Sequence, residues 1–107
     1  MQLRSYIEHV FMMNGATGPA YGTIVATGEN GNCLHHPAGE DILQDGHMVL
    51  VDAGSELSGY ASDITRTYPV NGKFSPAQRE IYELVLAAQE AAIKLILEAI
   101  DKAGYTA

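Results

Sequence analysis

Apolar residues near the start of the chain recur at the spacing of an amphipathic helix. They stand at Leu3, Tyr6, Ile7, Val10 and Phe11. This i, i+3, i+4, i+7, i+8 pattern places them on one face of a helix. Asn14 and Gly15 follow, and both residue types tolerate the left-handed conformation that ends helices. The pattern therefore predicts a helix from the first residues to Asn14.

A second and longer helical pattern covers the last third of the chain. Ser75 suits the N-cap, Pro76 the first helical position, and Gln78 completes a capping box with Ser75. Apolar residues then keep the helical period to about Lys102, and Gly104 suits the C-terminal cap. The apolar positions are Ile81, Leu84, Val85, Ala88, Ala92, Leu95, Ile96, Ala99 and Ile100.

Between the two helices, short runs of β-branched and aromatic residues alternate with turn residues, a pattern typical of antiparallel strands. Residues 23–27 predict one strand, residues 28–31 a turn, and residues 32–36 a returning strand. The whole order of helix, antiparallel strands and long helix predicts an α+β fold in which helices cover one face of a curved sheet.

The next predicted hairpin brings two carboxylates together. Residues 48–51 and 60–68 read as strands on either side of turn residues 53–59. A symmetric loop places Asp52 directly opposite Asp63, with Cβ atoms about 4.5–5.5 Å apart. Facing like charges destabilise a ladder, and a divalent cation held by carboxylate oxygens would offset this. Spacing alone also fits turn-forming or solvated aspartates, and a one-residue slip would send one carboxylate to the other face.

Composition narrows the class of protein. The 107 residues are 47% apolar and 18% charged, which indicates one small globular domain with a modest core. A net charge of −7 argues against a nucleic-acid or anionic-membrane partner. The one cysteine, Cys33, excludes an internal disulfide, fits a reducing compartment, and is expected to be buried in its strand. No apolar run is long enough to span a bilayer, so a cytoplasmic location is expected.

The amino-acid sequence of this hairpin resembles a known family signature. Asp52-Ala-Gly, followed by Gly59-Tyr-Ala-Ser-Asp-Ile-Thr-Arg-Thr67, resembles the first metal-binding segment of the M24 metallopeptidases, which share the pita-bread fold. Residues 22–31, 34–35, 45–46 and 68–82 look most like bacterial-type Xaa-Pro aminopeptidases. Methionine aminopeptidases typically carry a histidine where this chain has Ala61 or Ser62, which disfavours that branch. The resemblance runs from about Val10 to Ala92.

The resemblance implies a fold and a set of site residues. Residues 1–107 would be a fragment of a single M24 catalytic domain, comprising the first half of a pita-bread fold and the helix that opens the second half. Asp52 would bind one of two divalent ions and Asp63 would bridge both. The ions, expected to be Mn²⁺ with Co²⁺ or Zn²⁺ as options, would activate water and polarise the scissile carbonyl. His35 would contact substrate and help to move or stabilise a proton.

The implied activity is hydrolysis of the bond between an N-terminal residue and a following proline. The chain alone is expected to be inactive, because a full site of this family also needs a histidine and two glutamates from the second half. A prolidase that cuts Xaa-Pro dipeptides and a non-catalytic peptide-binding module of the same fold remain alternatives. An apolar face left without its packing partner suggests one further hypothesis, a homo-oligomer that covers it.

Overall fold

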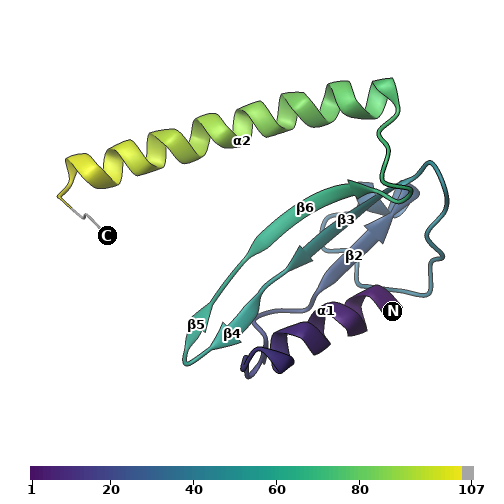
Figure 1. The fold of residues 1–107 in the computed structure, drawn as a ribbon, viewed down its shortest axis with the longest axis horizontal. Coiled ribbons are helices and arrows are strands. Elements are labelled where there is room, and N and C mark those ends of the chain that lie inside the picture. Colours follow the sequence, from purple (N-terminus) through teal and green to yellow (C-terminus); the bar gives the residue numbers. More distant parts are fainter. Residues whose placement is uncertain (105–107) are drawn as a thin grey trace. The chain divides into compact units, whose positions relative to one another are not determined.

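The computed structural model describes residues 1–104 and divides into two units, Met1–Lys73 and Phe74–Ala107, each of which is treated by itself. The first unit contains helix α1 (Gln2–Met13) and two three-stranded antiparallel sheets, and the second contains helix α2 (Pro76–Lys102) (Figure 1). Antiparallel strands and a long C-terminal helix confirm the secondary-structure order that the sequence predicts.

The two sheets share the strands of one long hairpin, and each adds one strand from an earlier part of the chain. One sheet has the order β2 (Ile24–Thr27), β3 (Met48–Ala53), β6 (Ile64–Pro69), and the other the order β1 (Gly18–Pro19), β4 (Ser55–Leu57), β5 (Tyr60–Ala61). Gly54 alone separates β3 from β4, and Ser62 and Asp63 separate β5 from β6. The ladder between the two arms therefore breaks once, nearer to the tip of the hairpin than to its base (Figure 1).

The tip of this hairpin is a two-residue turn. Leu57 pairs with Tyr60, and Ser58 and Gly59 between them have φ of 54° and 84°. Positive φ at both central residues is what a type I′ turn requires, and this turn matches the right-handed twist of its strands. The predicted symmetric loop over residues 53–59 is therefore wrong, because β4 and β5 extend the strands into it.

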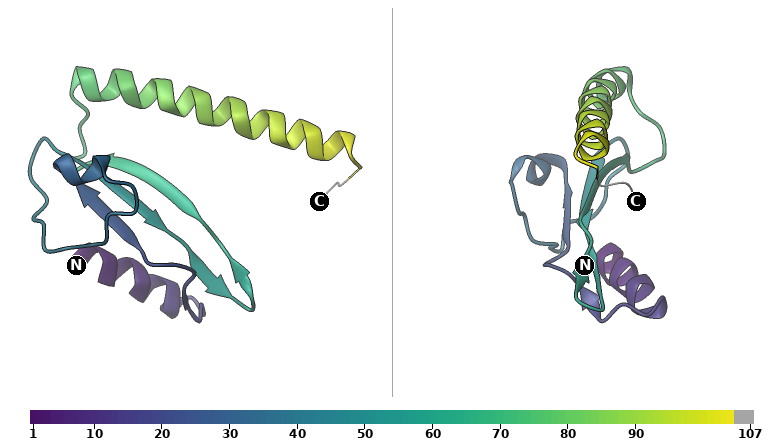
Figure 2. Two further views of the ribbon diagram at one scale, coloured as in Figure 1. Left: turned by 180° about the vertical axis from the view of Figure 1, so that it is seen from behind. Right: turned by 90° about the vertical axis from the view of Figure 1, so that its left-hand side faces the viewer.

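The core of the first unit is small. Its buried side chains are Thr23, Ile24, Ala26, Thr27, Val49 and Ala53. Helix α1 packs against β1 and β2, and the right-hand view of Figure 2 shows α1 and residues 28–47 on opposite sides of the sheet. A different segment thus lies on each side of the sheet.

Residues 28–36 depart from the predicted turn and returning strand. They form a 3-10 helix, η1 (Gly28–Asn32), followed by a turn at residues 34–35, and only Pro37 pairs with the sheet, through a single bridge to Ile24. The Gly-Glu-Asn-Gly-Asn composition favours compact turns over extended backbone. Cys33 is exposed, so its predicted burial is also wrong.

Helix α2 forms as its end signals predict. The Gln78 amide donates to Ser75 Oγ at 3.2 Å, and the Ser75 amide donates to Gln78 Oε1 at 2.9 Å, which completes the predicted capping box. The Phe74 and Tyr82 rings lie 4.8 Å apart. Gly104, with φ of 78°, follows the C-cap as predicted. Across residues 1–104, neither helix is both long and apolar enough for a membrane span.

Candidate metal centre

Asp52 and Asp63 lie on the same face of the hairpin, offset by two residues. Asp52 pairs with Thr65 and not, as predicted, with Asp63. The same register, continued through the break, sets Asp63 opposite Gly54. Residues two apart on a strand project from one face, so both carboxylates stay together. The predicted direct opposition is wrong because the turn is centred one residue further along the chain, which moves each pairing partner by two.

Tyr21 joins the two carboxylates. Its hydroxyl donates to Oδ1 of Asp52 and lies 3.1 Å from Oδ1 of Asp63. Burial raises the pKa of the Tyr21 hydroxyl well above its ordinary value, and its hydrogen bonds to the carboxylates and their charges raise it further. The hydroxyl is therefore a neutral proton donor throughout the physiological pH range, placed where two like charges meet.

The sequence interpretation missed Tyr21, although the position of this residue just before a predicted strand was a usable signal. Tyr21 lies three residues before Ile24, and Ile24 is the β2 residue that pairs with Asp52. A prediction of the β2–β3 pairing, and not only of the hairpin, would have placed the start of β2 beside the aspartates. The missing information was which strand lies next to β3.

Gly54 makes room for this arrangement. A Cβ atom at Gly54 would lie 1.7 Å from the Ser62 carbonyl oxygen and 2.9 Å from Cε1 of Tyr21. The Ala20 amide donates to the Gly54 carbonyl at 2.8 Å, which fixes the chain just before Tyr21. Across the hairpin, the Ser55 amide donates to Ser62 Oγ at 2.9 Å. The Ser62 amide donates to the Ser55 carbonyl at 3.0 Å, so a side-chain hydrogen bond replaces only one of the two backbone bonds of this pair.

His35 lies on the loop that follows η1. It is exposed, has φ of 59°, and follows Leu34, which is 86% exposed. Pro37 bridges to Ile24, and Ile24 pairs with Asp52 on its other side. Pro37 and Asp52 are thus two strand spacings apart, roughly 10 Å. The structure brings the loop of His35 near the aspartates, on turn backbone and not on the predicted strand.

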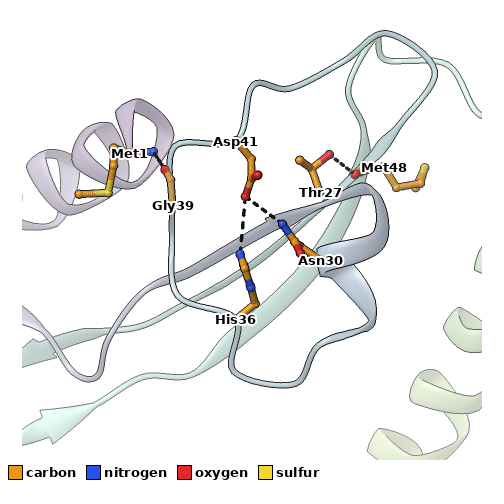
Figure 3. Close-up of polar contacts among 7 residues, drawn as sticks. All are labelled: Met1, Thr27, Asn30, His36, Gly39, Asp41 and Met48. Atoms are coloured by element: carbon orange, nitrogen blue, oxygen red, sulfur yellow. Dashed lines mark hydrogen bonds and ion pairs between the residues drawn. The ribbon is translucent and has the colours of Figure 1, made fainter.

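Polar contacts hold this loop (Figure 3). Oδ2 of Asp41 accepts a hydrogen bond from Asn30 Nδ2 at 3.0 Å and lies 3.6 Å from His36 Nε2. The N-terminal amino group donates to the Gly39 carbonyl at 2.7 Å. The imidazole of His36, the neighbour of His35, is thus directed to Asp41 within the loop.

The two aspartates fit part of a metal site. Oδ1 of each carboxylate meets the same Tyr21 hydroxyl, and carboxylate oxygens are the ligands that Mn²⁺ and similar hard ions prefer. Among residues 1–104, no group of three or more His, Cys, Asp or Glu side chains is arranged to hold a metal ion. Asp52 and Asp63 could therefore supply two ligands, and a complete coordination shell needs others.

Comparison with known proteins gives consistent matches. The sequence model of Metallopeptidase family M24 matches residues 1–103. Xaa-Pro aminopeptidase of Escherichia coli (strain K12) is 54% identical over 93 residues, covering 87% of this chain and 21% of the relative. Xaa-Pro aminopeptidase of Haemophilus influenzae is 53% identical over 96 residues, covering 90% and 22%. The chain thus spans about a fifth of the length of these relatives.

Solved structures match as well. Zn-substituted E. coli aminopeptidase P in complex with product has 53% sequence identity and a TM-score of 0.85, over 88% of this chain and 21% of that chain. A second structure of E. coli aminopeptidase P, an aspartate-to-alanine variant, has a TM-score of 0.82 over 84% of this chain and 20% of its own. These similarities confirm the predicted partial pita-bread fold.

Proposed function

Since this chain belongs to metallopeptidase family M24, we propose that it forms part of a longer Xaa-Pro aminopeptidase, called the parent protein below. Residues 1–107 are then the first half of its catalytic domain and the helix that opens the second half. The division of the chain at Phe74, where the segment of α2 begins, is in line with this assignment.

The observation that carries the proposal is the convergence of Asp52 and Asp63 on one hydroxyl from one face of the hairpin. Two adjacent carboxylates repel each other because both are negatively charged, and a divalent cation bound between them removes this repulsion. In the parent protein Asp52 and Asp63 bind the metal ions, and the remaining ligands come from outside residues 1–104.

Residue spacing in the solved relatives supports this assignment. The E. coli aminopeptidase P structures include alanine variants of two aspartates eleven positions apart and of a histidine seventeen positions before the first. In this chain Asp52 and Asp63 are also eleven positions apart, and His35 precedes Asp52 by seventeen. A match at both spacings within an aligned region supports roles for all three residues.

The residues of this chain then divide the work. When bound, the divalent ions, Mn²⁺ in our proposal, lower the pKa of water and polarise the scissile carbonyl. Asp52 and Asp63 hold them in place. The exposed imidazole of His35 contacts the peptide and holds or moves a proton at the reacting bond. The substrate is a peptide with proline at its second position, and the parent protein acts in the cytoplasm.

The test compares aspartate variants of the Mn²⁺-loaded parent protein on an Xaa-Pro tripeptide. We expect Asp52→Asn and Asp63→Asn each to lower kcat/KM by about two orders of magnitude or more and to lose bound metal. Asp101→Asn, an exposed aspartate of α2, is the matched control and should change kcat/KM less than about twofold.

Other outcomes would replace the proposal. Hydrolysis of Xaa-Pro dipeptides but not of tripeptides would make the parent protein a prolidase. Binding of the tripeptide without cleavage by any metal-loaded form would make it a binding module. If the wild-type parent protein is active and both aspartate variants still bind metal, Asp52 and Asp63 are not metal ligands.

A further inference from the structure

Tyr21 reaches the aspartates from a separate part of the chain, just before β2, and contacts both of them. Its hydroxyl donates to Oδ1 of Asp52 and lies 3.1 Å from Oδ1 of Asp63. We infer that Tyr21 is a positioning residue of the metal centre, an inference that rests on the proposed function of Asp52 and Asp63. Its hydroxyl sets the orientation of both carboxylates before an ion arrives.

The contacts leave the aspartates free to bind metal. An ionised carboxylate has two oxygens and about four acceptor sites. Tyr21 meets only Oδ1 of each side chain, so Oδ2 of each remains for an ion, as do further lone pairs of Oδ1. Hydrogen bonds from a surrounding group commonly fix the orientation of metal-binding side chains in this way, and their loss weakens metal binding about 10- to 100-fold.

Asp63 has particular need of such a contact. It lies in the break between β5 and β6 and is exposed, so packing does little to restrict its side-chain rotamers. Asp52 lies within β3 and is half-buried. A hydroxyl held between them couples the exposed carboxylate to the more rigid one, which lowers the entropy that metal binding must remove.

The position of Tyr21 is itself fixed by the fold. The 2.8 Å bond from the Ala20 amide to the Gly54 carbonyl ties the preceding residue to the hairpin. Cε1 of Tyr21 lies where a Cβ atom on Gly54 would meet it at 2.9 Å. The Tyr21 ring therefore packs against the backbone of Gly54. Contacts with main-chain atoms, and not with mobile side chains, hold the ring and its hydroxyl in position.

The test is metal binding by the metal-free parent protein carrying Tyr21→Phe, which keeps the ring against Gly54 and removes only the hydroxyl. We expect Mn²⁺ titration calorimetry to give a Kd about 10-fold or more above that of the wild type. The visible absorption spectrum of the Co²⁺-loaded variant should also differ, because that spectrum reports ligand geometry. Tyr60→Phe, on the same hairpin and 83% exposed, is the control and should leave both readouts unchanged.

The outcomes separate this inference from the function on which it rests. Equal Mn²⁺ affinity and an identical Co²⁺ spectrum for Tyr21→Phe and wild type, with metal binding abolished in Asp52→Asn, would overturn the role of Tyr21 alone. A wild-type parent protein that binds neither ion, or aspartate variants that bind as wild type does, would overturn the proposed function first.

Discussion

The central hairpin and helix α2 are built by different kinds of interaction. Each feature that defines α2 joins residues within a few positions, such as the Ser75–Gln78 capping box and the Arg79–Glu83 ion pair of 2.6 Å. The hairpin instead depends on fit between distant residues, since Tyr21 meets Asp52 and Asp63 over sequence separations of 31 and 42. Contacts between near neighbours in sequence are thus enough to define a helix. The geometry of the site instead depends on contacts between residues that are far apart in sequence.

The largest effect expected from this contrast is at Gly54. Gly54→Ala places a Cβ atom 1.7 Å from the Ser62 carbonyl oxygen, so backbone must move at the break that carries Asp63. We expect a loss of about 3 kcal/mol or more in the free energy of unfolding, measured by urea denaturation of the parent protein. Gly22→Ala is the control, because nothing lies within 4 Å of the added atom, and it should cost about 0.5 kcal/mol or less. Equal losses of unfolding free energy for Gly54→Ala and Gly22→Ala would refute close packing around Gly54.

A smaller effect is expected at the start of α2. Ser75→Ala removes the hydroxyl that accepts from the Gln78 amide at 3.2 Å, and N-cap substitutions of this kind cost about 1 kcal/mol. Hydrogen exchange at the Gln78 amide should accelerate, while exchange in the hairpin stays as it was. Ser75→Thr keeps an acceptor and should exchange nearly as slowly as wild type. Disturbed exchange in the hairpin would show that α2 is not governed by its local signals.

The smallest effect separates two ion pairs with the same i, i+4 spacing. The hydrogen bond from Arg4 lowers the pKa of Glu8 in α1. A lowered pKa in the folded state stabilises the fold above the ordinary glutamate pKa of about 4.3, and this stabilisation is lost as the pH falls through the lowered value. Arg4→Met should cost about 0.5 kcal/mol at pH 7, and the difference from wild type should vanish in acid.

The matched variant for that pair is Arg79→Met, because Arg79 and Glu83 have side-chain exposures of 71% and 58%, against 34% and 19% for Arg4 and Glu8. Solvent screens an exposed pair more strongly, so its loss should cost less than the loss of Arg4. Denaturation curves of both variants between pH 3 and pH 7 measure this. A cost for Arg4→Met that does not change with pH would assign the effect to packing of the side-chain stem.

The sequence predicts more of the fold than of the site. Both helices and the β3–β6 hairpin follow from periodicity and from end signals, each of which is local. The pairing of Asp52 was wrong because it depends on where the turn is centred, and Ser58-Gly59 is the dipeptide that marks it. Positive φ at both residues makes the two-residue turn possible and sets the pairing of every residue behind it.

The segment that carries His35 was the least predictable part. Residues 32–36 have the apolar and polar mixture of a short strand, yet His35 adopts a left-handed conformation that no periodicity reveals. The contacts of Asp41 with Asn30 and His36 hold this loop in place of a ladder. Tyr21 was missed for a related reason. It lies in a loop, and it comes close to the aspartates only because the following strand, β2, pairs with β3.

The two-residue turn also constrains how this chain can change in length over evolution. An insertion at Ser58-Gly59 can be absorbed by a longer tip, because the paired arms behind it need not shift. A single residue added between Tyr60 and Asp63 would instead reverse the face of one carboxylate, or require a β-bulge to restore it. Among homologous sequences, gaps in this region should therefore gather at the tip, and the lengths of the two arms should be kept even where their side chains differ.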